Sequence, residues 1–139
     1  MNEFDMIWQV KQLSTAFDRA ELPVLQALEL SPSEGLLLIC MADLGKDYCY
    51  ATQLHTALGL SRPAVSSTVK RLRLKGFVAY REDENDDRRR QIVLLPKTRD
   101  AIPALRQAMR EWANACTQDI SPADLETARC VLKAMRSRM

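Results

Sequence analysis

The spacing of apolar residues predicts a mainly helical protein. Near the start of the chain, Met6, Val10, Leu13 and Phe17 follow one another at intervals of 4, 3 and 4 residues, which places them on one face of a helix over residues 2–20. Pro23 is expected to kink or restart this helix, because proline cannot continue the hydrogen-bond ladder.

Two further helices are predicted from their N-terminal caps. Ser31 before Pro32, with Glu34 three residues after the serine, has the residue types of a capping box, and residues 36–44 then form an almost uninterrupted apolar segment. That segment predicts a central buried helix. The same cap recurs at Ser121, before a stripe that includes Leu132.

Residues 51–75 have the pattern of a helix-turn-helix. A short helix over 51–58 and a second over 62–75 are separated by Gly59, Leu60 and Ser61, and we expect Leu60 to be buried and Ser61 to cap the second helix. Tyr50 stands at the cap of the first helix, where serine or threonine would serve better. Apolar residues on the second helix recur at intervals of 4 and 3; they are Val65, Val69 and Leu72.

Two β-like runs, residues 77–81 and 91–95, follow a helix stop at Gly76. Between them lie residues 82–90, of which eight of nine are charged, and we expect this segment to be a loop. A helix followed by a charged hairpin is the outline of a winged helix-turn-helix. The predicted fold is therefore mainly α, with about six helices and a small β-hairpin wing.

A long helix is predicted over residues 99–117. Its apolar positions recur at intervals of 3, 4, 3 and 4, which forms a seam of two heptads. A single buried helix would show the same stripe, but the flanking polar residues favour pairing between two chains. The expected dimerisation residues are Ile102, Leu105, Met109, Trp112 and, on the last helix, Leu132.

Charge distribution indicates a polyanionic partner. The net charge is only +2, yet residues 61–81 contain six basic side chains and no acidic one. A local basic segment in a nearly neutral protein indicates contact with a polyanion at one place. The alternative is a solvated helix face without a partner.

The second helix of the helix-turn-helix can present small residues and hydrogen-bond donors to a DNA groove, with its N-terminal residues nearest the bases. Its cap and first-turn amides suit a phosphate. The candidate contacts on this helix are Ser61, Arg62, Pro63, Ala64, Ser66, Ser67, Lys70 and Arg71.

In the charged segment, Arg88, Arg89 and Arg90 follow the acidic residues. Asp87 lies two positions before Arg89 and can brace its guanidinium, so that Arg89 enters a narrow minor groove. The alternative is a charged hairpin tip that only keeps the sheet edge soluble.

Other chemistry has little support in the sequence. The four cysteines have no CxxC spacing, His55 is the only histidine, and we find no nucleophile–base pair or phosphate-binding glycine loop. We therefore expect no metal, no cofactor and no enzyme activity. The longest apolar run is too short to span a bilayer and the first residues do not form a signal peptide, which favours a cytoplasmic protein.

Several short motifs occur in a fixed order along the chain: 30–34 (LSPSE), 58–66 (LGLSRPAVS), Leu72, 75–78 (KGFV), 87–89 (DRR) and Leu95. In this order and spacing they resemble, over nearly the whole chain, the MarR (multiple antibiotic resistance regulator) family of dimeric winged-helix repressors. The chain departs from the family pattern after the wing, where Leu95 is followed by Pro96.

The resemblance implies a single domain over residues 1–139, with a winged helix-turn-helix lobe at 31–96 and dimerisation helices at 1–30 and 97–139. It implies a homodimer on a pseudo-palindromic duplex operator, with the wings in minor grooves and Asp87 and Arg89 as a recurrent wing pair.

The resemblance also implies a small aromatic or amphipathic effector bound between the dimerisation helices and the DNA-binding lobe. Candidate lining residues are Trp8, Phe17, Met41 and Trp112; residues of these types are more often plain core, which is the alternative for each of them. Some family members sense oxidants through a cysteine, and Cys49 is the best candidate here, if its thiol is accessible and deprotonated.

Two alternatives therefore stay open beside the ligand-responsive repressor. One is a winged-helix protein-interaction module or antirepressor that does not bind DNA. The other is a cysteine-based redox regulator on the same fold.

Overall fold

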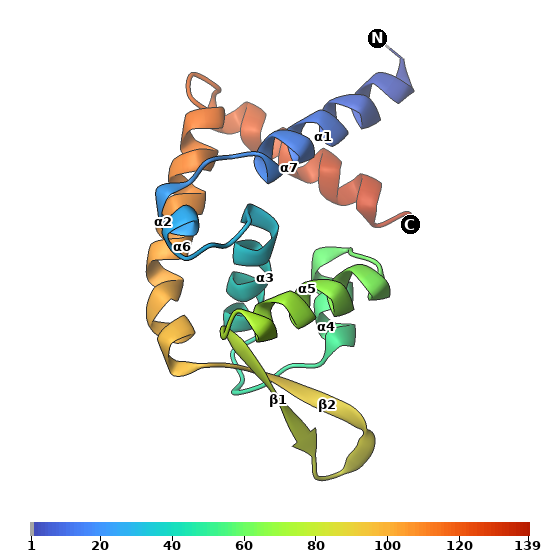
Figure 1. Cartoon of the computed structure of the whole chain (residues 1–139). Helices are drawn as coiled ribbons and strands as arrows, with labels where there is room; N and C mark the ends of the chain where they lie inside the picture. Colours follow the sequence, from blue (N-terminus) through green and yellow to red (C-terminus); the bar gives the residue numbers. More distant parts are fainter. Residues whose placement is uncertain (1) are drawn as a thin grey trace. The chain divides into compact units, whose positions relative to one another are not determined.

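The computed structural model describes residues 2–139, with side chains throughout except at residues 86 and 87. Within this part of the chain there are seven helices and one two-stranded antiparallel sheet (Figure 1). The mainly helical winged helix-turn-helix prediction is confirmed. In chain order the elements are α1 (Glu3–Asp18), α2 (Pro23–Ala27), α3 (Pro32–Asp43), α4 (Ala51–Leu58), α5 (Arg62–Leu74), β1 (Val78–Asp83), β2 (Asp86–Leu94), α6 (Pro96–Cys116) and α7 (Pro122–Arg136).

The chain divides into two compact units, Met1–Arg106 and Gln107–Met139, with the boundary inside α6. The first unit contains α1 to α5, the hairpin and the start of α6. The second contains the rest of α6 and α7. Among the described residues, none of the helices combines the length and apolar character needed to cross a membrane.

Serine side chains cap α3, α5 and α7, as the sequence predicts. Ser31 Oγ accepts a hydrogen bond from the Glu34 amide at 3.1 Å, and Glu34 Oε1 accepts one from the Ser31 amide at 2.9 Å, which completes the capping box of α3. Ser61 and Ser121 cap α5 and α7 in the same way. At the C-terminal end of α4, Gly59 has a φ of +67°, a left-handed conformation that glycine adopts without strain.

The core of the first unit lies between α3 and the helix-turn-helix. Leu37 and Leu38 on α3, Leu54 on α4, and Val65 and Leu72 on α5 are all fully buried. Each such side chain contributes about 1.5–3 kcal/mol when it is removed from water. Leu60, by contrast, is 37% exposed, so the prediction that it is buried is wrong. Leu60 lies in the turn between α4 and α5, and this turn is at the surface.

The hairpin is longer than the sequence predicts. The strands pair in register from Val78 opposite Leu94 to Glu82 opposite Arg90, with an irregularity before Asp83 pairs with Asp86. Most of the charged segment expected to be a loop is therefore strand. Glu82 faces Arg90 across the ladder, and Arg89 and Arg90 lie over tyrosine rings. Charged side chains thus find partners along these strands without an alternation of apolar residues.

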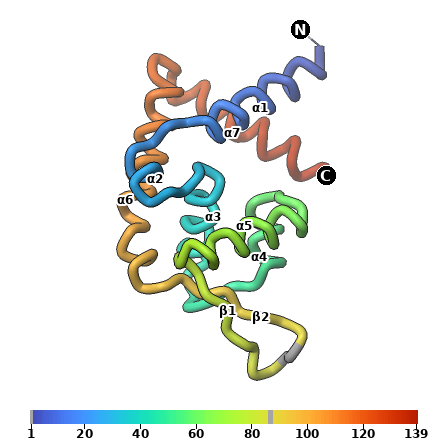
Figure 2. Tube along the Cα trace, viewed as in Figure 1, coloured from blue at the N-terminus to red at the C-terminus, as the bar shows by residue number. Residues whose placement is uncertain are grey.

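The segment before α4 is added to this sheet. Cys49 and Ile92 exchange two backbone hydrogen bonds, of 2.9 and 2.8 Å, and form a single antiparallel bridge. Figure 2 follows the chain from α5 into the hairpin and on to α6. The start of α4 is thus fixed against the strand that carries the wing arginines.

The long helix α6 starts three residues earlier than predicted. Pro96 occupies its first turn, where a missing N–H costs nothing. Thr98 is fully buried, and its hydroxyl donates a hydrogen bond to the Phe77 carbonyl at 2.7 Å. This contact joins the start of α6 to the start of the hairpin.

Candidate nucleic-acid interface

Helix α5 separates a buried face from an exposed one. Val65, Thr68, Val69 and Leu72 are buried against the core. The predicted DNA contacts lie on the other side: Ser61, Arg62, Pro63, Ser66, Ser67, Lys70 and Arg71 are exposed, and Ala64 is half-buried. The structure therefore brings the predicted residues of this helix together on one surface, with the small residues Pro63, Ala64, Ser66 and Ser67 in its first two turns.

Arg71 is held by the protein itself. Its guanidinium donates hydrogen bonds to Ser67 Oγ at 2.9 Å and to Thr68 Oγ1 at 3.1 Å, and its Nε lies 3.7 Å from Glu34. Arg71 is predicted to contact DNA, but in the structure its guanidinium is held within the protein. The other cations among the predicted contacts on this helix are Arg62 and Lys70.

Glu34 is the centre of a buried charge cluster beneath α5. Its carboxylate is 3% exposed and accepts hydrogen bonds from Lys75 Nζ at 2.9 Å and from the Ser31 amide. Burial alone raises the pKa of Glu34, but the hydrogen bonds from Ser31 and Lys75 and the Lys75 charge outweigh it, so the pKa is lowered overall. Glu34 is therefore ionised at neutral pH, and it joins the start of α3 to the end of α5.

Four arginines near the wing lie over tyrosine rings. The Cζ of Arg89 is 3.6 Å from the centre of the Tyr50 ring, and that of Arg90 is 4.4 Å from the centre of the Tyr80 ring. Longer contacts, of 5.4 and 5.5 Å, join Arg81 to Tyr48 and Arg73 to Tyr80. A cation over an aromatic face is attracted by the ring quadrupole, so these contacts restrict where the arginines can go.

Asp83 connects the wing to α4. It is 6% exposed and accepts hydrogen bonds from the Tyr50 hydroxyl at 2.6 Å and from the Asn85 amide at 2.9 Å. These two bonds and the nearby charge of Arg89 lower the pKa of Asp83, against the opposing effect of burial. Asp83 therefore carries a negative charge close to Arg89.

The predicted Asp87–Arg89 brace lies outside the described side chains, because that of Asp87 is not among them. Arg88, Arg89 and Arg90 are all exposed on β2. Together with Tyr50, Ala51 and Thr52 they line a cavity of about 180 Å³.

Sequence reasoning missed Tyr50 and Asp83. Two features of the sequence could have indicated Tyr50. One is the alternation of aromatic and apolar residues at Tyr48, Cys49 and Tyr50, and the other is the unusual cap that Tyr50 provides for α4.

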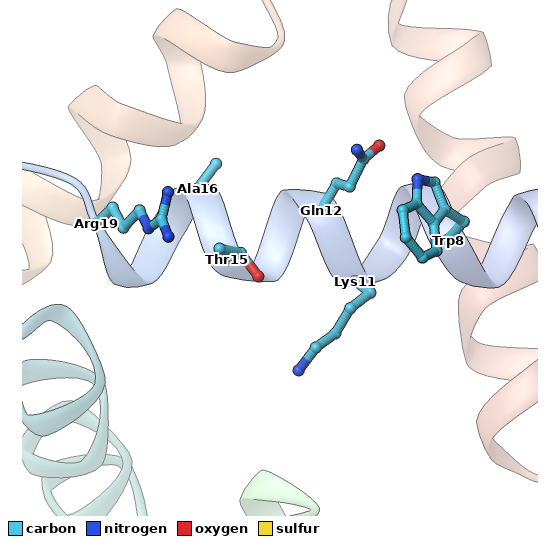
Figure 3. Close-up of a pocket in the computed structure, with 6 residues that line it drawn as sticks. All are labelled: Trp8, Lys11, Gln12, Thr15, Ala16 and Arg19. Atoms are coloured by element: carbon cyan, nitrogen blue, oxygen red, sulfur yellow. The ribbon is translucent and has the colours of Figure 1, made fainter.

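A groove of about 400 Å³ runs along α1, lined by Trp8, Lys11, Gln12, Thr15, Ala16 and Arg19. Figure 3 shows these side chains along the helix, with Trp8 toward one end and Arg19 toward the other. Trp8 is the one predicted effector residue in this groove. The other three predicted residues are not among those that line it. Phe17 is half-buried on α1, Met41 is 4% exposed on α3, and Trp112 is half-buried on α6.

The predicted dimer seam contains two kinds of residue. Ile102 and Leu105 are 7% and 0% exposed within the single chain, so they belong to its own core and are not a surface for a second copy. Met109 and Trp112 are half-buried, and Leu132 is 40% exposed. The spacing could not separate these two groups, because core and seam positions share the same helical period.

Cys49 does not have the properties of a sensor thiol. It is 2% exposed, and burial, with a smaller effect of Cys40, raises its pKa to about 11. A sensor thiol needs to be accessible and ionised, so the prediction for Cys49 is corrected. Among the described residues, no group of three or more His, Cys, Asp or Glu could hold a metal, and the His55 ring contacts the Leu60 carbonyl.

This geometry is that of a winged helix-turn-helix protein. A family model described as the MarR family matches residues 18–89, more than half of the chain. The chain belongs to the MarR family of transcriptional regulators. No curated protein matches it by sequence.

Solved structures share the fold. The transcriptional regulator SlyA has a TM-score of 0.87 and 17% identity, covering 96% of this chain and 93% of SlyA. MepR of S. aureus, solved in complex with DNA, has a TM-score of 0.83 and 19% identity, covering 95% and 96%. BpsR of Bordetella bronchiseptica, whose DNA binding is regulated by 6-hydroxynicotinic acid, has a TM-score of 0.82 and 16% identity, covering 97% and 93%.

Proposed function

We propose that this protein is a sequence-specific, double-stranded DNA-binding transcriptional repressor that acts as a homodimer in the cytoplasm, on the chromosome. The observation that carries the proposal is the exposed face of α5, which presents small residues and cations beside a wing with three consecutive arginines. A helix of this kind fits the major groove, and arginines on a hairpin suit the backbone or the minor groove. MepR, which shares the fold, was solved with DNA.

In this proposal the contacts divide into two classes. Arg62, Lys70 and the wing arginines neutralise phosphates and set the affinity and its salt dependence. Ser66 and Ser67, with the first turn of α5, contact base edges and set the sequence preference. Arg71 serves mainly to hold the exposed face in shape, because its guanidinium is occupied by Ser67 and Thr68.

We further propose that a second copy covers the exposed apolar residues near both chain ends. Phe4, Ile7 and Leu13 on α1 are 68%, 48% and 56% exposed, and Val131 and Leu132 on α7 are about 40% exposed. Exposed apolar side chains in such number mark an interaction surface. Two copies would present two α5 helices to two half-sites of a pseudo-palindrome.

The effector proposed for this regulator is a small aromatic or amphipathic molecule. The residues of the groove along α1 favour an aromatic compound with a carboxylate, because Trp8 supplies a ring face and Lys11 and Arg19 supply positive charge. The regulation of BpsR by 6-hydroxynicotinic acid gives an example on the same fold.

The test is selection of bound duplexes from a random pool, followed by titration of the enriched sequence by fluorescence anisotropy at fixed salt. We expect an enriched pseudo-palindrome, a dimer mass by light scattering, and a loss of about 1–3 kcal/mol in binding free energy for Arg89→Ala. Failure to enrich any sequence would instead support a protein-interaction module. An unchanged Kd for Arg89→Ala would remove the wing from the interface.

A further inference from the structure

Tyr50 contacts both strands of the hairpin near its tip, although it belongs to neither. Its hydroxyl donates a hydrogen bond to Asp83 at the end of β1, and its ring lies beneath Arg89 on β2. The cation lies 3.6 Å from the ring centre, the shortest of the arginine–tyrosine contacts in the described part of the chain. One side chain at the start of α4 thus joins the helix-turn-helix to the wing.

Backbone pairing alone leaves this end of the hairpin weakly fixed. The register is regular from Val78 to Glu82, but the ladder is irregular between Glu82 and Asp83. Beyond that point the backbone gives less support to the position of the strand ends. The contact between Tyr50 and Asp83 lies at this irregularity.

The backbone of Tyr50 is itself well fixed. Its neighbour Cys49 exchanges two hydrogen bonds with Ile92, and its own amide donates to Gln53 Oε1 at 2.8 Å. The backbone at Tyr50 is therefore fixed by hydrogen bonds to β2 and to the first turn of α4. The position of its ring is set by α4 and by β2 together.

Asp83 also requires a partner. It is 6% exposed, and a carboxylate removed from water is costly unless hydrogen bonds or an opposite charge compensate it. The Tyr50 hydroxyl, the Asn85 amide and the charge of Arg89 supply this compensation. The contact is thus a specific polar arrangement, which an apolar side chain of similar size would not reproduce.

We infer that Tyr50 is a positioning residue for DNA binding, which holds Arg89 against the duplex through its ring and fixes the wing tip through its hydroxyl bond to Asp83. The inference rests on the proposed function. Arg89 makes the contact with DNA, and Tyr50 acts through it. A guanidinium whose face is covered by a ring still presents its N–H groups at the edge, where phosphate or base acceptors can meet them.

A double-mutant cycle in operator binding tests this role. Tyr50→Leu removes ring and hydroxyl, Tyr50→Phe removes only the hydroxyl, and each is made in the wild-type and Arg89→Ala backgrounds. In the wild-type background we expect about a tenfold rise in Kd for Tyr50→Leu and a smaller rise for Tyr50→Phe. In the Arg89→Ala background Tyr50→Leu should have little further effect, because contacting residues are not additive. Tyr48→Phe, which keeps its ring, is the matched control.

A second measurement does not depend on DNA. The hydrogen bond to Asp83 raises the pKa of Tyr50, with smaller contributions from burial and from other neighbours. In a pH titration of ring-labelled tyrosines by NMR, Asp83→Asn should lower the pKa of Tyr50, because it removes the carboxylate that accepts the hydrogen bond from the Tyr50 hydroxyl. The same titration reports whether the Tyr50 variants remain folded.

The outcomes separate the two levels of the proposal. Equal effects of Tyr50→Leu in both backgrounds, or no effect in the wild-type background, would overturn the positioning role while DNA binding stands. A Tyr50 pKa that does not respond to Asp83→Asn would overturn the hydroxyl contact. Failure of the wild-type chain to bind any duplex would overturn the proposed function, and the role of Tyr50 with it.

Discussion

The carboxylate of Glu34 lies 2.9 Å from Nζ of Lys75, and only 3% of the Glu34 side chain is exposed. The two residues are 41 positions apart in the chain. Lys75 also donates a hydrogen bond to the Glu29 carbonyl at 2.7 Å. The end of α5 is therefore anchored both to the start of α3 and to the segment before it.

Lys75→Ala should destabilise the protein by about 1–3 kcal/mol, because it leaves a buried carboxylate without its main cationic partner. The change is measured as the shift in the free energy of unfolding from urea titration. Lys70→Ala is the matched control, since Lys70 is exposed on the same helix, and it should change stability by less than about 0.5 kcal/mol. Equal effects of the two substitutions would show that Glu34 does not depend on Lys75.

Stability should fall in acid, with a contribution from Glu34. Since the pKa of Glu34 is lowered in the folded state, the unfolded chain binds more protons in acid. The stabilisation is fully present above the ordinary glutamate pKa of about 4.3 and is lost as the pH falls through the lower folded value. Urea midpoints between pH 3 and 7 should therefore drop less steeply for Glu34→Gln than for the wild type. Parallel curves would contradict this assignment.

Cys49 should resist thiol reagents. Its pKa of about 11 and its 2% exposure leave little thiolate at pH 8, so modification should be slower than in the unfolded chain by roughly two orders of magnitude or more. Mass spectrometry after timed labelling, in buffer and in urea, measures this ratio. Comparable rates in the two conditions would restore Cys49 as a candidate sensor.

Lys70 should contribute to the salt dependence of DNA binding. If its ammonium neutralises one phosphate, Lys70→Ala should reduce the slope of log K against log salt by about 1. It should also weaken binding to all duplexes by a similar factor. Lys11→Ala on α1 is the control and should leave the slope unchanged. Loss of sequence preference without a change in slope would indicate a base contact instead.

Substitutions at Leu105 and Leu132 should have different effects, the first on the stability of the fold and the second on dimer formation. Leu105 is fully buried, and Leu105→Ala should cost about 2–5 kcal/mol of stability through the cavity it leaves. Leu132 is 40% exposed, and Leu132→Glu should shift light scattering toward the monomer mass with the helix content retained. A dimer that persists in Leu132→Glu would remove α7 from the proposed interface.

Local features of the sequence predicted most of the helices. The caps at Ser31, Ser61 and Ser121 act over three residues, and the stripe through Val65 and Leu72 follows from one helical period, so both can be read without tertiary information. The exposed face of α5 follows from the same pattern.

The contacts that organise the candidate site could not be predicted in this way. Tyr50 and Asp83 are 33 positions apart, and their pairing depends on the bridge between Cys49 and Ile92. The strands in the charged segment were not predicted, because their residues are charged and show no alternation of apolar and polar side chains. Their contacts are between arginines and tyrosine rings, and a hydropathy pattern does not show such contacts. The division of the α6 stripe into core and surface likewise depends on packing.

The arginines that lie over tyrosine rings have a thermodynamic consequence for association. A free arginine side chain carries about 2 kcal/mol of rotamer entropy, which a complex must remove when the side chain is immobilised. Arg73, Arg81, Arg89 and Arg90 are already confined by Tyr48, Tyr50 and Tyr80 when the chain folds. This part of the ordering cost therefore falls on folding, and in the proposed complex with DNA these arginines would lose less conformational entropy on binding.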